Sequence, residues 1–378
     1  MSLAGIQFNA AGWQGIIGED FTFGRVRSLS AAFAQSVSAP RKRPTFLVAY
    51  DTHFLSDEFA QAAAAALESR GARAFLADRP MPAPAVSFEI LRRRLAGGIY
   101  LGAGDAPGDS NGLQFFNAEA APESTERLRE IERLAGKSVD EEFSGETGSI
   151  KWETFDATEH YFQQIANLVR LDAIRRAGIG FAIDLMHGAG AGWIDRLLVA
   201  AGVPIQVLNQ NRDVLFDGGA PDPSPANLER LAEAVRATGA ALGLATGGDG
   251  RRFGILDNVG CFVPPGVIVA LVYDYLVESR GRRLGVARGS GDWRMLEAVA
   301  HLRKLPVHET RVGPHGLASL LAKEKLALAV DANGGITTRG HVPESDGILA
   351  CLLVAEMVAE RGPLDGQLKK LIRRVGGE

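Results

Sequence analysis

The stretch Thr45-Phe46-Leu47-Val48-Ala49-Tyr50 decides the fold class of this chain. This short run of apolar and aromatic residues predicts a β-strand. An alanine-rich segment with helical character follows at 57–69, and a second apolar run follows at 72–76. Because strand, helix and strand succeed one another, we expect a right-handed crossover and a mainly parallel sheet. The stretch therefore indicates an α/β protein.

The same alternation of apolar runs and amphipathic segments continues along the chain. Further strands are predicted at 98–101, 180–184, 205–208, 242–244, 285–287 and 326–330. Further helices are predicted at 88–95, 156–176, 194–201, 227–238, 267–279, 293–302, 317–324 and 345–360. A polar, acidic stretch at 139–148 is the first expected linker. We predict three successive α/β domains with mixed or parallel sheets, at 1–145, 150–257 and 258–378, each within the usual range of domain size.

Composition excludes several classes of protein. Hydrophobic residues make up 46% of the chain and charged residues 23%, as in ordinary soluble globular proteins. A net charge of −4 argues against a nucleic-acid-binding surface, and no run is long and apolar enough to span a bilayer. Cys261 and Cys351 each lie in an apolar run, which suits a reducing compartment. We therefore expect a cytoplasmic protein without nucleic-acid or membrane partners.

The loop Ala-Thr-Gly-Gly-Asp-Gly-Arg-Arg-Phe-Gly at 245–254 combines glycines with three charged residues. A hard cation such as Mg²⁺ needs several oxygen ligands, usually carboxylates, and Asp249 is the single carboxylate of this loop. Together with Arg251 and Arg252 it leaves the loop with a net positive charge, which suits an anion. An ordinary turn, with arginines that are solvated or paired to a carboxylate across a cleft, explains the same residues.

Motifs in order along the chain resemble the α-D-phosphohexomutases, the phosphoglucomutase/phosphomannomutase family. One of them reads Arg-Gly-His-Val-Pro-Glu-Ser-Asp-Gly at 339–347, and the others lie at 8–22, 50–56, 184–190 and 242–254. Members of this family catalyse a reversible phosphoryl shift between the 1 and 6 positions of a hexose phosphate. They use a phosphoserine, Mg²⁺ and a fourth domain that grips the substrate phosphate. The resemblance implies three α/β domains of the phosphohexomutase type.

The phosphoserine loop of this family reads Thr-Ala-Ser-His-Asn-Pro, and the matching stretch here is Gly-Ala-Gly-Asp-Ala-Pro at 102–107. Gly104 stands at the serine position and Asp105 at the histidine position. Because Gly104 has no side-chain oxygen, the usual phosphoenzyme cannot form there. Ser110 is the nearby hydroxyl that could substitute, although its Gly/Asp/Asn setting favours a turn residue. The resemblance therefore leaves no catalytic group intact.

The other family loops are changed as well. The resemblance places Gly247, Asp249 and Arg251 where the family has three metal-binding aspartates, so Asp249 is a vestigial ligand. An early family arginine is Gln14 here, and a family lysine is matched by His315. The fourth domain would follow position 362, and we expect it to be absent because the sequence ends at 378.

The sugar-reading loop of the family carries paired glutamates, and the matching residues here are Asp331-Ala332-Asn333-Gly334-Gly335. One acidic residue thus survives, although Asp331 could equally cap the following turn. His187, within the His-Gly-Ala-Gly stretch, is a candidate ligand contact and equally a turn residue bonded to local backbone.

We therefore predict a phosphohexomutase-like protein without mutase activity that binds a sugar phosphate or another small anion in a regulatory role. The predicted contacts are Arg251, Arg252, His187, His315, Asp331 and Asn333. No bound metal is expected, although Mg²⁺ would be needed if family activity is retained. Two alternatives stay open. The chain could be an active phosphoglucomutase/phosphomannomutase that uses Ser110, Asp105 or a partner chain, or it could be a structural partner, as a homodimer or beside a complete mutase.

Overall fold

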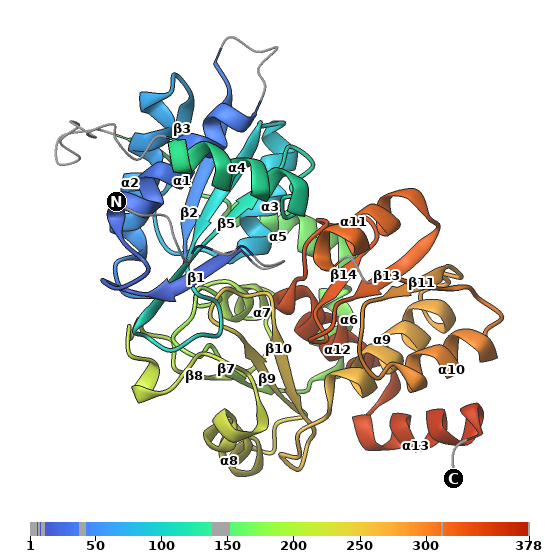
Figure 1. Ribbon diagram of the computed structural model, residues 1–378. Coiled ribbons are helices and arrows are strands. Elements are labelled where there is room, and N and C mark those ends of the chain that lie inside the picture. Colours follow the sequence, from blue (N-terminus) through green and yellow to red (C-terminus); the bar gives the residue numbers. More distant parts are fainter. Residues whose placement is uncertain are drawn as a thin grey trace.

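The computed structural model describes residues 6, 8, 12–37, 43–137, 152–310 and 313–376. These residues form three α/β units, each built around its own sheet, that follow one another along the chain (Figure 1). Parallel and antiparallel pairs occur in each sheet. The predicted fold class, three successive α/β domains with mixed sheets, is therefore confirmed. The linker expected at 139–148 lies outside the described residues.

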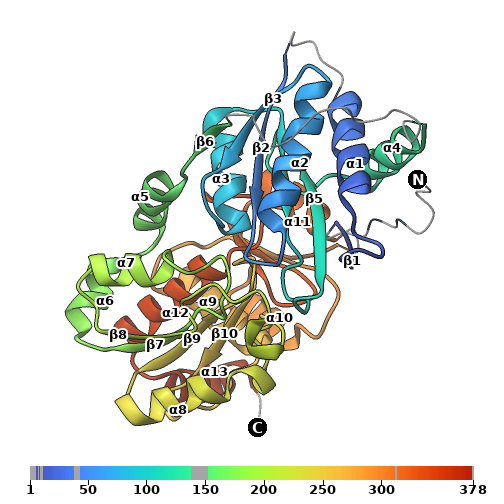
Figure 2. The same ribbon diagram turned by 90° about the vertical axis from the view of Figure 1, so that its left-hand side faces the viewer.

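The first sheet has six strands in the order β1-β5-β4-β2-β3-β6 among the described residues. β2 lies between β4 and β3 and is parallel to both, whereas β5 is antiparallel to its neighbours. The strands are β1 (Trp13–Ile16), β2 (Thr45–Tyr50), β3 (Arg73–Ala77), β4 (Gly97–Leu101), β5 (Ser110–Phe116) and β6 (Glu153–Phe155). The helices of this unit are α1 (Phe23–Ser36), α2 (Ser56–Ser69), α3 (Ala83–Arg93) and α4 (Thr125–Lys137). The crossover from β2 to β3 and the crossover from β3 to β4 run in opposite directions across the sheet. Because such crossovers are right-handed, α2 and α3 cover opposite faces of the sheet (Figure 2).

The second and third sheets repeat this plan with four strands each in the described chain, in the orders β10-β9-β7-β8 and β12-β11-β13-β14. The second contains β7 (Phe181–Asp184), β8 (Ile205–Leu208), β9 (Leu242–Thr246) and β10 (Phe253–Leu256), with helices α5 (Thr158–Leu168), α6 (Leu171–Ala177), α7 (Ile194–Ala200) and α8 (Glu229–Thr238). The third contains β11 (Gly285–Arg288), β12 (Val307–Glu309), β13 (Leu326–Val330) and β14 (Ile336–Thr338), with helices α9 (Pro265–Glu278), α10 (Arg294–Leu302), α11 (Gly313–Lys323), α12 (Gly347–Arg361) and α13 (Leu364–Val375). In each unit the chain reverses its winding direction beside a central strand.

Helix α12 joins the second and third units. It follows β14 in the chain but packs against α6, β9 and β10 of the second unit as well as α9 of the third. Twelve consecutive residues of this helix, 347–358, are buried, so apolar side chains contact neighbours on every side. Asp346 caps its first turn by accepting a hydrogen bond from Leu349 N at 2.9 Å. The two units therefore share a core through this helix.

Three helix predictions differ from the structure by four residues or more. The helix expected at 317–324 begins earlier, as Gly313–Lys323. The helix expected at 88–95 begins earlier, as Ala83–Arg93. Pro84 lies in its first turn, where the backbone N–H that proline lacks would have no partner within the helix. The helix expected at 156–176 is broken into α5 and α6. At the break, Arg170 N donates to Glu356 Oε2 of α12 at 2.7 Å instead of to a carbonyl within a continuous helix. Tertiary contact here overrides a local helical pattern.

The loops that matter for function follow the carboxyl ends of parallel strands. Residues 102–107 follow β4, residues 247–252 follow β9, and residues 331–335 follow β13. Ligands of open α/β sheets bind at this edge, beside the strand where the winding direction reverses. In the part of the chain that the structure describes, no helix combines the length and the apolar character that crossing a membrane requires.

Candidate functional site

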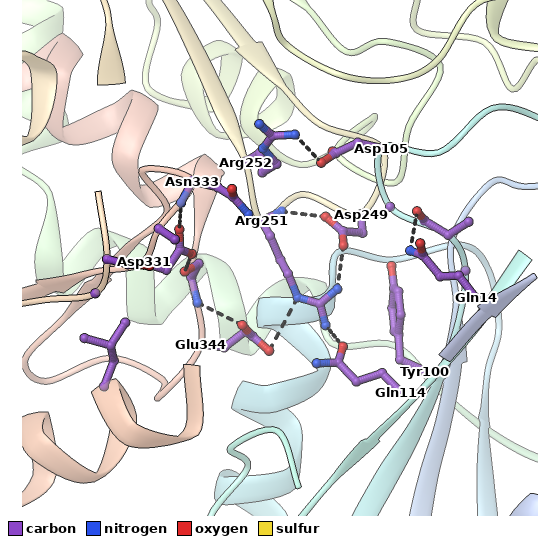
Figure 3. A pocket seen from close by; sticks show the side chains of 18 of the residues that line it. Gln14, Tyr100, Asp105, Gln114, Asp249, Arg251, Arg252, Asp331, Asn333 and Glu344 are labelled. Atoms are coloured by element: carbon purple, nitrogen blue, oxygen red, sulfur yellow. Dashed lines mark hydrogen bonds and ion pairs between the residues drawn. The ribbon is translucent and has the colours of Figure 1, made fainter. Parts of the chain in front are cut away.

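A cavity of about 330 Å³ lies where the three units meet. Figure 3 shows its side chains converging from the loops that follow β4, β9 and β13. Its charged lining residues are Asp105, Asp249, Arg251, Arg252, Asp331 and Glu344, and its neutral polar ones include Gln14, Gln114, Ser290, Asn333 and Ser345. Because residues far apart in sequence converge here, this cavity is the candidate functional site.

Gly104 forms part of the cavity wall and faces the loop from the second unit. A Cβ atom added at Gly104 would lie 3.0 Å from Asp249 Oδ2, and the backbone is left-handed there, with φ +62°. This is the position that the resemblance assigns to the family serine. Glycine offers no oxygen to accept a phosphoryl group at this point of the wall.

A buried pair, Asp51 and His53, supports the 102–107 loop from below. Asp51 Oδ2 lies 2.8 Å from His53 Nδ1 and accepts a hydrogen bond from Gly104 N at 3.3 Å. His53 Nε2 lies 3.0 Å from the carbonyl oxygen of Ala106. Burial alone would lower the pKa of His53, but the Asp51 carboxylate and the Ala106 carbonyl raise it above its ordinary value. Side chains that do not line the cavity thus fix the loop that does.

Arg251 reaches across the cavity and holds the three units together (Figure 3). Its guanidinium donates to Asp249 Oδ2 at 2.5 Å and to Gln114 Oε1, and it lies 3.4 Å from Glu344 Oε2. It also lies over the ring of Tyr100, 5.4 Å from the ring centroid. The side chain is 18% exposed. Burial would lower the pKa of Arg251, but the facing Glu344 and Asp249 carboxylates raise it, so the group is a permanent cation.

Arg252 points away from Arg251 and makes a separate, shallower cluster (Figure 3). It donates to Asp105 Oδ2 at 2.5 Å and to Asp222 Oδ1 at 2.9 Å, and its side chain is 36% exposed. Burial and the nearby Asp249 carboxylate raise the pKa of Asp105 to about 6, although Arg252 opposes the shift. Asp105 Oδ1 is buried and accepts no hydrogen bond from the described residues.

These contacts correct the charge balance expected from the loop alone. Four carboxylates but only two guanidinium groups line the cavity, so its lining is acidic rather than basic when all of them are ionised. The net charge of the 245–254 loop did not include these carboxylates, because Asp105, Asp331 and Glu344 come from the first and third units. The open alternative, arginines paired to carboxylates across a cleft, is confirmed.

The residues at the family metal loop do not fit a Mg²⁺ ion. Asp249 accepts hydrogen bonds on both carboxylate oxygens, from Arg251 N at 3.0 Å and from the Arg251 guanidinium. Gly247 carries no ligand, and a Cβ there would lie 2.7 Å from Asp105 Oδ1. A hard divalent cation needs several oxygen ligands, and this loop offers the single carboxylate of Asp249, beside the positive charge of the Arg251 guanidinium.

Asp331 and Asn333 lie at the third wall of the cavity. Asp331 Oδ1 accepts hydrogen bonds from Asn333 N at 2.8 Å and Gly335 N at 3.0 Å, and its Oδ2 accepts one from Ser345 Oγ at 2.9 Å. Asp331 therefore caps the turn that follows it, which is one of the two roles that the sequence left open for this residue. The exposed Asn333 side chain is left to face the cavity (Figure 3).

Three predicted site residues lie elsewhere. Ser110 begins β5, bonds to Asp109 Oδ1 at 3.0 Å and does not line the cavity. His187 lies beside Asn211 and Asp217 in the second unit, and His315 bonds to the Pro122 carbonyl at 3.2 Å. Neither histidine lines the cavity, so the structure does not bring these two predicted contacts together with Asp331 and Asn333. A carbonyl of the same unit holds the His187 ring outside the cavity, and a carbonyl of the first unit holds the His315 ring outside it.

Sequence reasoning missed Gln114, Tyr100 and Glu344 as cavity residues. Gln114 and Tyr100 lie on adjacent strands, where nothing in the local pattern marks them. Glu344 stands within the 339–347 motif and is 4% exposed in its side chain, with a pKa raised by burial despite Arg251. A buried acid inside a recognised motif is a signal that could have found it.

Family models for phosphoglucomutase/phosphomannomutase α/β/α domains I, II and III match residues 5–141, 159–260 and 264–375. A phosphoglucosamine mutase from Xylella fastidiosa strain M12 is 30% identical over 362 residues, which cover 92% of this chain and 76% of that protein. A phosphoglucomutase/phosphomannomutase from Thermococcus kodakarensis is 26% identical over 362 residues, covering 94% of this chain and 77% of that protein.

Solved structures show the same architecture. A provisionally assigned phosphomannomutase from Thermus thermophilus superposes with a TM-score of 0.91 at 28% identity, covering 98% of this chain and 84% of the other. An N-acetylphosphoglucosamine mutase from Aspergillus fumigatus, solved in complex with GlcNAc-6P and magnesium, superposes with a TM-score of 0.56 at 14% identity. At that identity the second likeness concerns the fold alone.

Proposed function

Because the chain belongs to the phosphoglucomutase/phosphomannomutase family, we propose that it binds a sugar phosphate between its three domains without transferring the phosphoryl group. One observation carries the proposal. The wall position that faces the metal loop is Gly104, so the site has a place for the ligand but this position has no oxygen to receive phosphate. Ligand binding without turnover suits a regulatory protein that reports the level of a sugar phosphate.

We further propose that binding needs no Mg²⁺ at the family loop. The Arg251 guanidinium bridges Asp249, Gln114 and Glu344 and supplies a fixed positive charge at the centre of the domain contacts. An arginine remains charged at all physiological pH values and cannot be removed by chelation. Domain contacts that depend on this charge would not change with the concentration of Mg²⁺.

The ligand phosphate would bind at Arg252. This arginine is twice as exposed as Arg251, and Asp105, one of its partners, has a pKa of about 6 and is the easiest carboxylate to displace. A phosphate can replace Asp105 as a charge-assisted acceptor for the same guanidinium. Asn333 and Ser345 would then bind sugar hydroxyls from the opposite wall.

The acidic lining favours an amino sugar over a neutral one. Several relatives are named phosphoglucosamine mutases. An ammonium group in the cavity would be attracted by the Glu344 and Asp331 carboxylates, whereas a neutral hydroxyl gains no such attraction. We therefore propose glucosamine 6-phosphate as a better ligand than glucose 6-phosphate or mannose 6-phosphate.

Calorimetric titration tests this function. Glucosamine 6-phosphate, glucose 6-phosphate, mannose 6-phosphate and inorganic phosphate are titrated into the protein, once with EDTA and once with Mg²⁺. We expect saturable binding of the sugar phosphates, equal in both buffers and tightest for the amino sugar. Binding that appears only with Mg²⁺, or no binding of any sugar phosphate, would refute the proposal. Arg252→Ala should weaken the binding of every sugar phosphate. Arg294→Ala is its matched control, because Arg294 is 88% exposed and does not line the cavity.

One observation favours a second candidate, an active mutase that forms an aspartyl phosphate. Asp105 lines the cavity and its Oδ1 accepts no hydrogen bond from the described residues. This oxygen would attack phosphorus in a sugar bisphosphate, forming an acyl phosphate as the bond to the sugar oxygen breaks, and the leaving oxygen would take up a proton. The intact mass after incubation with glucose 1,6-bisphosphate would rise by one phosphate, and Asp105→Asn would abolish the gain. An unchanged mass would exclude this candidate.

A further inference from the structure

A cluster of potential metal ligands lies in the second unit outside the cavity. His187, Asp213 and Asp217 each place one ligand atom within 4.8 Å of the other two. None of the three lines the cavity, and the proposed binding of a sugar phosphate uses none of them. An imidazole with two carboxylates is a donor set that proteins use for divalent transition metals.

The hydrogen bond of the His187 ring decides which nitrogen is free. Nδ1 lies 2.7 Å from the carbonyl oxygen of Asn211. A carbonyl can only accept, so Nδ1 carries a proton and donates it, and in the neutral ring Nε2 presents a lone pair. Nε2 is buried, receives no hydrogen bond from the described residues and lies 3.5 Å from Asp217 Oδ2. A lone pair that faces a carboxylate oxygen is favourable only with a cation between them or a proton on the ring.

The distance between two of the three ligand atoms suits a metal ion. Bonds of about 2.0–2.1 Å from zinc to nitrogen and oxygen separate two ligands of a tetrahedron by roughly 3.3–3.4 Å. The 3.5 Å between His187 Nε2 and Asp217 Oδ2 is close to this edge. The carbonyl of Asn211 behind the ring is the partner that commonly orients a metal-binding histidine. An imidazole ligand favours Zn²⁺ and its neighbours over Mg²⁺ and Ca²⁺, which prefer oxygen.

The loop that carries the two carboxylates is already organised. Asp213 accepts hydrogen bonds from Leu215 N at 2.9 Å and from Asp217 N at 3.0 Å. Each carboxylate oxygen retains a second lone pair for a metal. Arg230 pairs with Asp217 Oδ2 at 2.9 Å, but both side chains are more than half exposed, so this competing ion pair is weak.

We propose that His187, Asp213 and Asp217 bind one divalent transition metal ion of the Zn²⁺ class, with water completing the coordination. The site would tie the second domain to the first. Arg212, from the same loop, donates to the carbonyl oxygens of Thr52 and His53 at 3.1 Å each. The neighbouring Phe216 ring lies 4.7 Å from the His53 ring, between centroids. Metal binding therefore restrains the contact beneath the 102–107 loop.

Competition with a chromophoric chelator tests the proposal on the untagged full-length chain carrying Cys261→Ser, which removes an exposed thiol. After dialysis against EDTA, Zn²⁺ should bind with one equivalent per chain. Asp213→Asn, Asp217→Asn and His187→Asn should each weaken binding at least tenfold, and asparagine tolerates the left-handed backbone at 187, with φ +55°. Co²⁺ should give visible absorption bands typical of a four-coordinate site, and these should vanish in the same variants.

His301→Asn, Asp172→Asn and Asp249→Asn are the matched controls, and each should leave Zn²⁺ affinity unchanged. Circular dichroism identifies any variant that fails to fold, and the three ligand variants together keep the test decisive. One-equivalent binding that survives His187→Asn, or that is lost in Asp249→Asn, would overturn the proposal, as would the absence of binding. Calorimetry with glucosamine 6-phosphate on the same variants reports the cavity separately, so failure at one site is distinguishable from failure at the other.

Discussion

Arg251 and Arg252 are neighbours in the chain but belong to two different regions of the cavity. Arg251 is 18% exposed and has a carboxylate or amide partner from each of the three domains. Arg252 is 36% exposed and pairs with Asp105 and Asp222 near the opening. The deep cluster joins the domains, whereas the shallow cluster has a cation that a ligand can reach.

The difference shows that residue type alone does not assign a role to an arginine. A cation that faces two buried carboxylates cannot exchange partners without leaving Asp249 and Glu344 uncompensated, so we infer a structural role for Arg251. A partly exposed cation loses little when it exchanges Asp105 for a phosphate, so we infer that Arg252 is available for binding.

The largest effect is expected from Arg251→Met. Removing the guanidinium leaves two buried carboxylates without their cation, and such losses cost about 3–5 kcal/mol. We expect the free energy of unfolding, measured by urea denaturation, to fall by about that amount. Arg294→Met, at an exposed site, should change it by less than about 0.5 kcal/mol. Equal stability of the two variants would mean that the deep cluster does not join the domains.

Arg252→Ala should lower the affinity for the ligand more than it lowers the free energy of unfolding. The affinity for glucosamine 6-phosphate is expected to fall by roughly tenfold to a hundredfold, the loss of one charge-assisted contact. The free energy of unfolding should change by no more than about 1 kcal/mol, because the ion pairs of Arg252 are partly solvated. Calorimetry and urea denaturation on the same preparation provide both values. A large loss of stability with unchanged affinity would show that Arg252 has a structural role and does not bind the ligand.

Gly104→Ala should disturb the deep cluster and leave the shallow one unchanged. The added Cβ would approach Asp249, and alanine at φ +62° is strained by about 1–2 kcal/mol. We expect a loss of stability of that size, measured by urea denaturation, with the affinity for sugar phosphate within about twofold of the original. Stabilisation by the substitution would contradict the geometry of the loop.

The smallest effect concerns pH. The pKa of Asp105 is about 6 in the folded protein, raised by burial, so between about pH 4 and 6 the folded chain binds more protons than the unfolded chain. The stability that this group contributes is therefore fully present below about pH 4 and is lost as pH rises through 6. Relative to Asp105→Asn, the original protein should lose on the order of 1 kcal/mol between pH 4 and 7. Urea denaturation across that range checks the slope, and parallel curves for the two proteins would refute the raised pKa.

The sequence predicted the sheets better than the site. The run 45–50 is a strand with the predicted bounds, because buried strands depend mainly on local apolar pattern. The side chains of Gln114 and Arg251 meet across 137 residues of chain, which no local pattern encodes. The positions of Gly104, Asp249 and Asp331 at the cavity followed from motifs, whereas the outward placement of His187 and His315 depends on backbone carbonyls that a sequence does not reveal.

The central claim, a cavity that binds a sugar phosphate but has no acceptor for its phosphoryl group, is tested most directly by mutase turnover. The purified full-length chain is incubated with glucosamine 6-phosphate, Mg²⁺ and a catalytic amount of sugar bisphosphate, and the 1-phosphate is followed by phosphorus NMR. The account predicts no product above the buffer control at ligand concentrations that saturate binding. Steady conversion to the 1-phosphate at an ordinary enzymatic rate would contradict it.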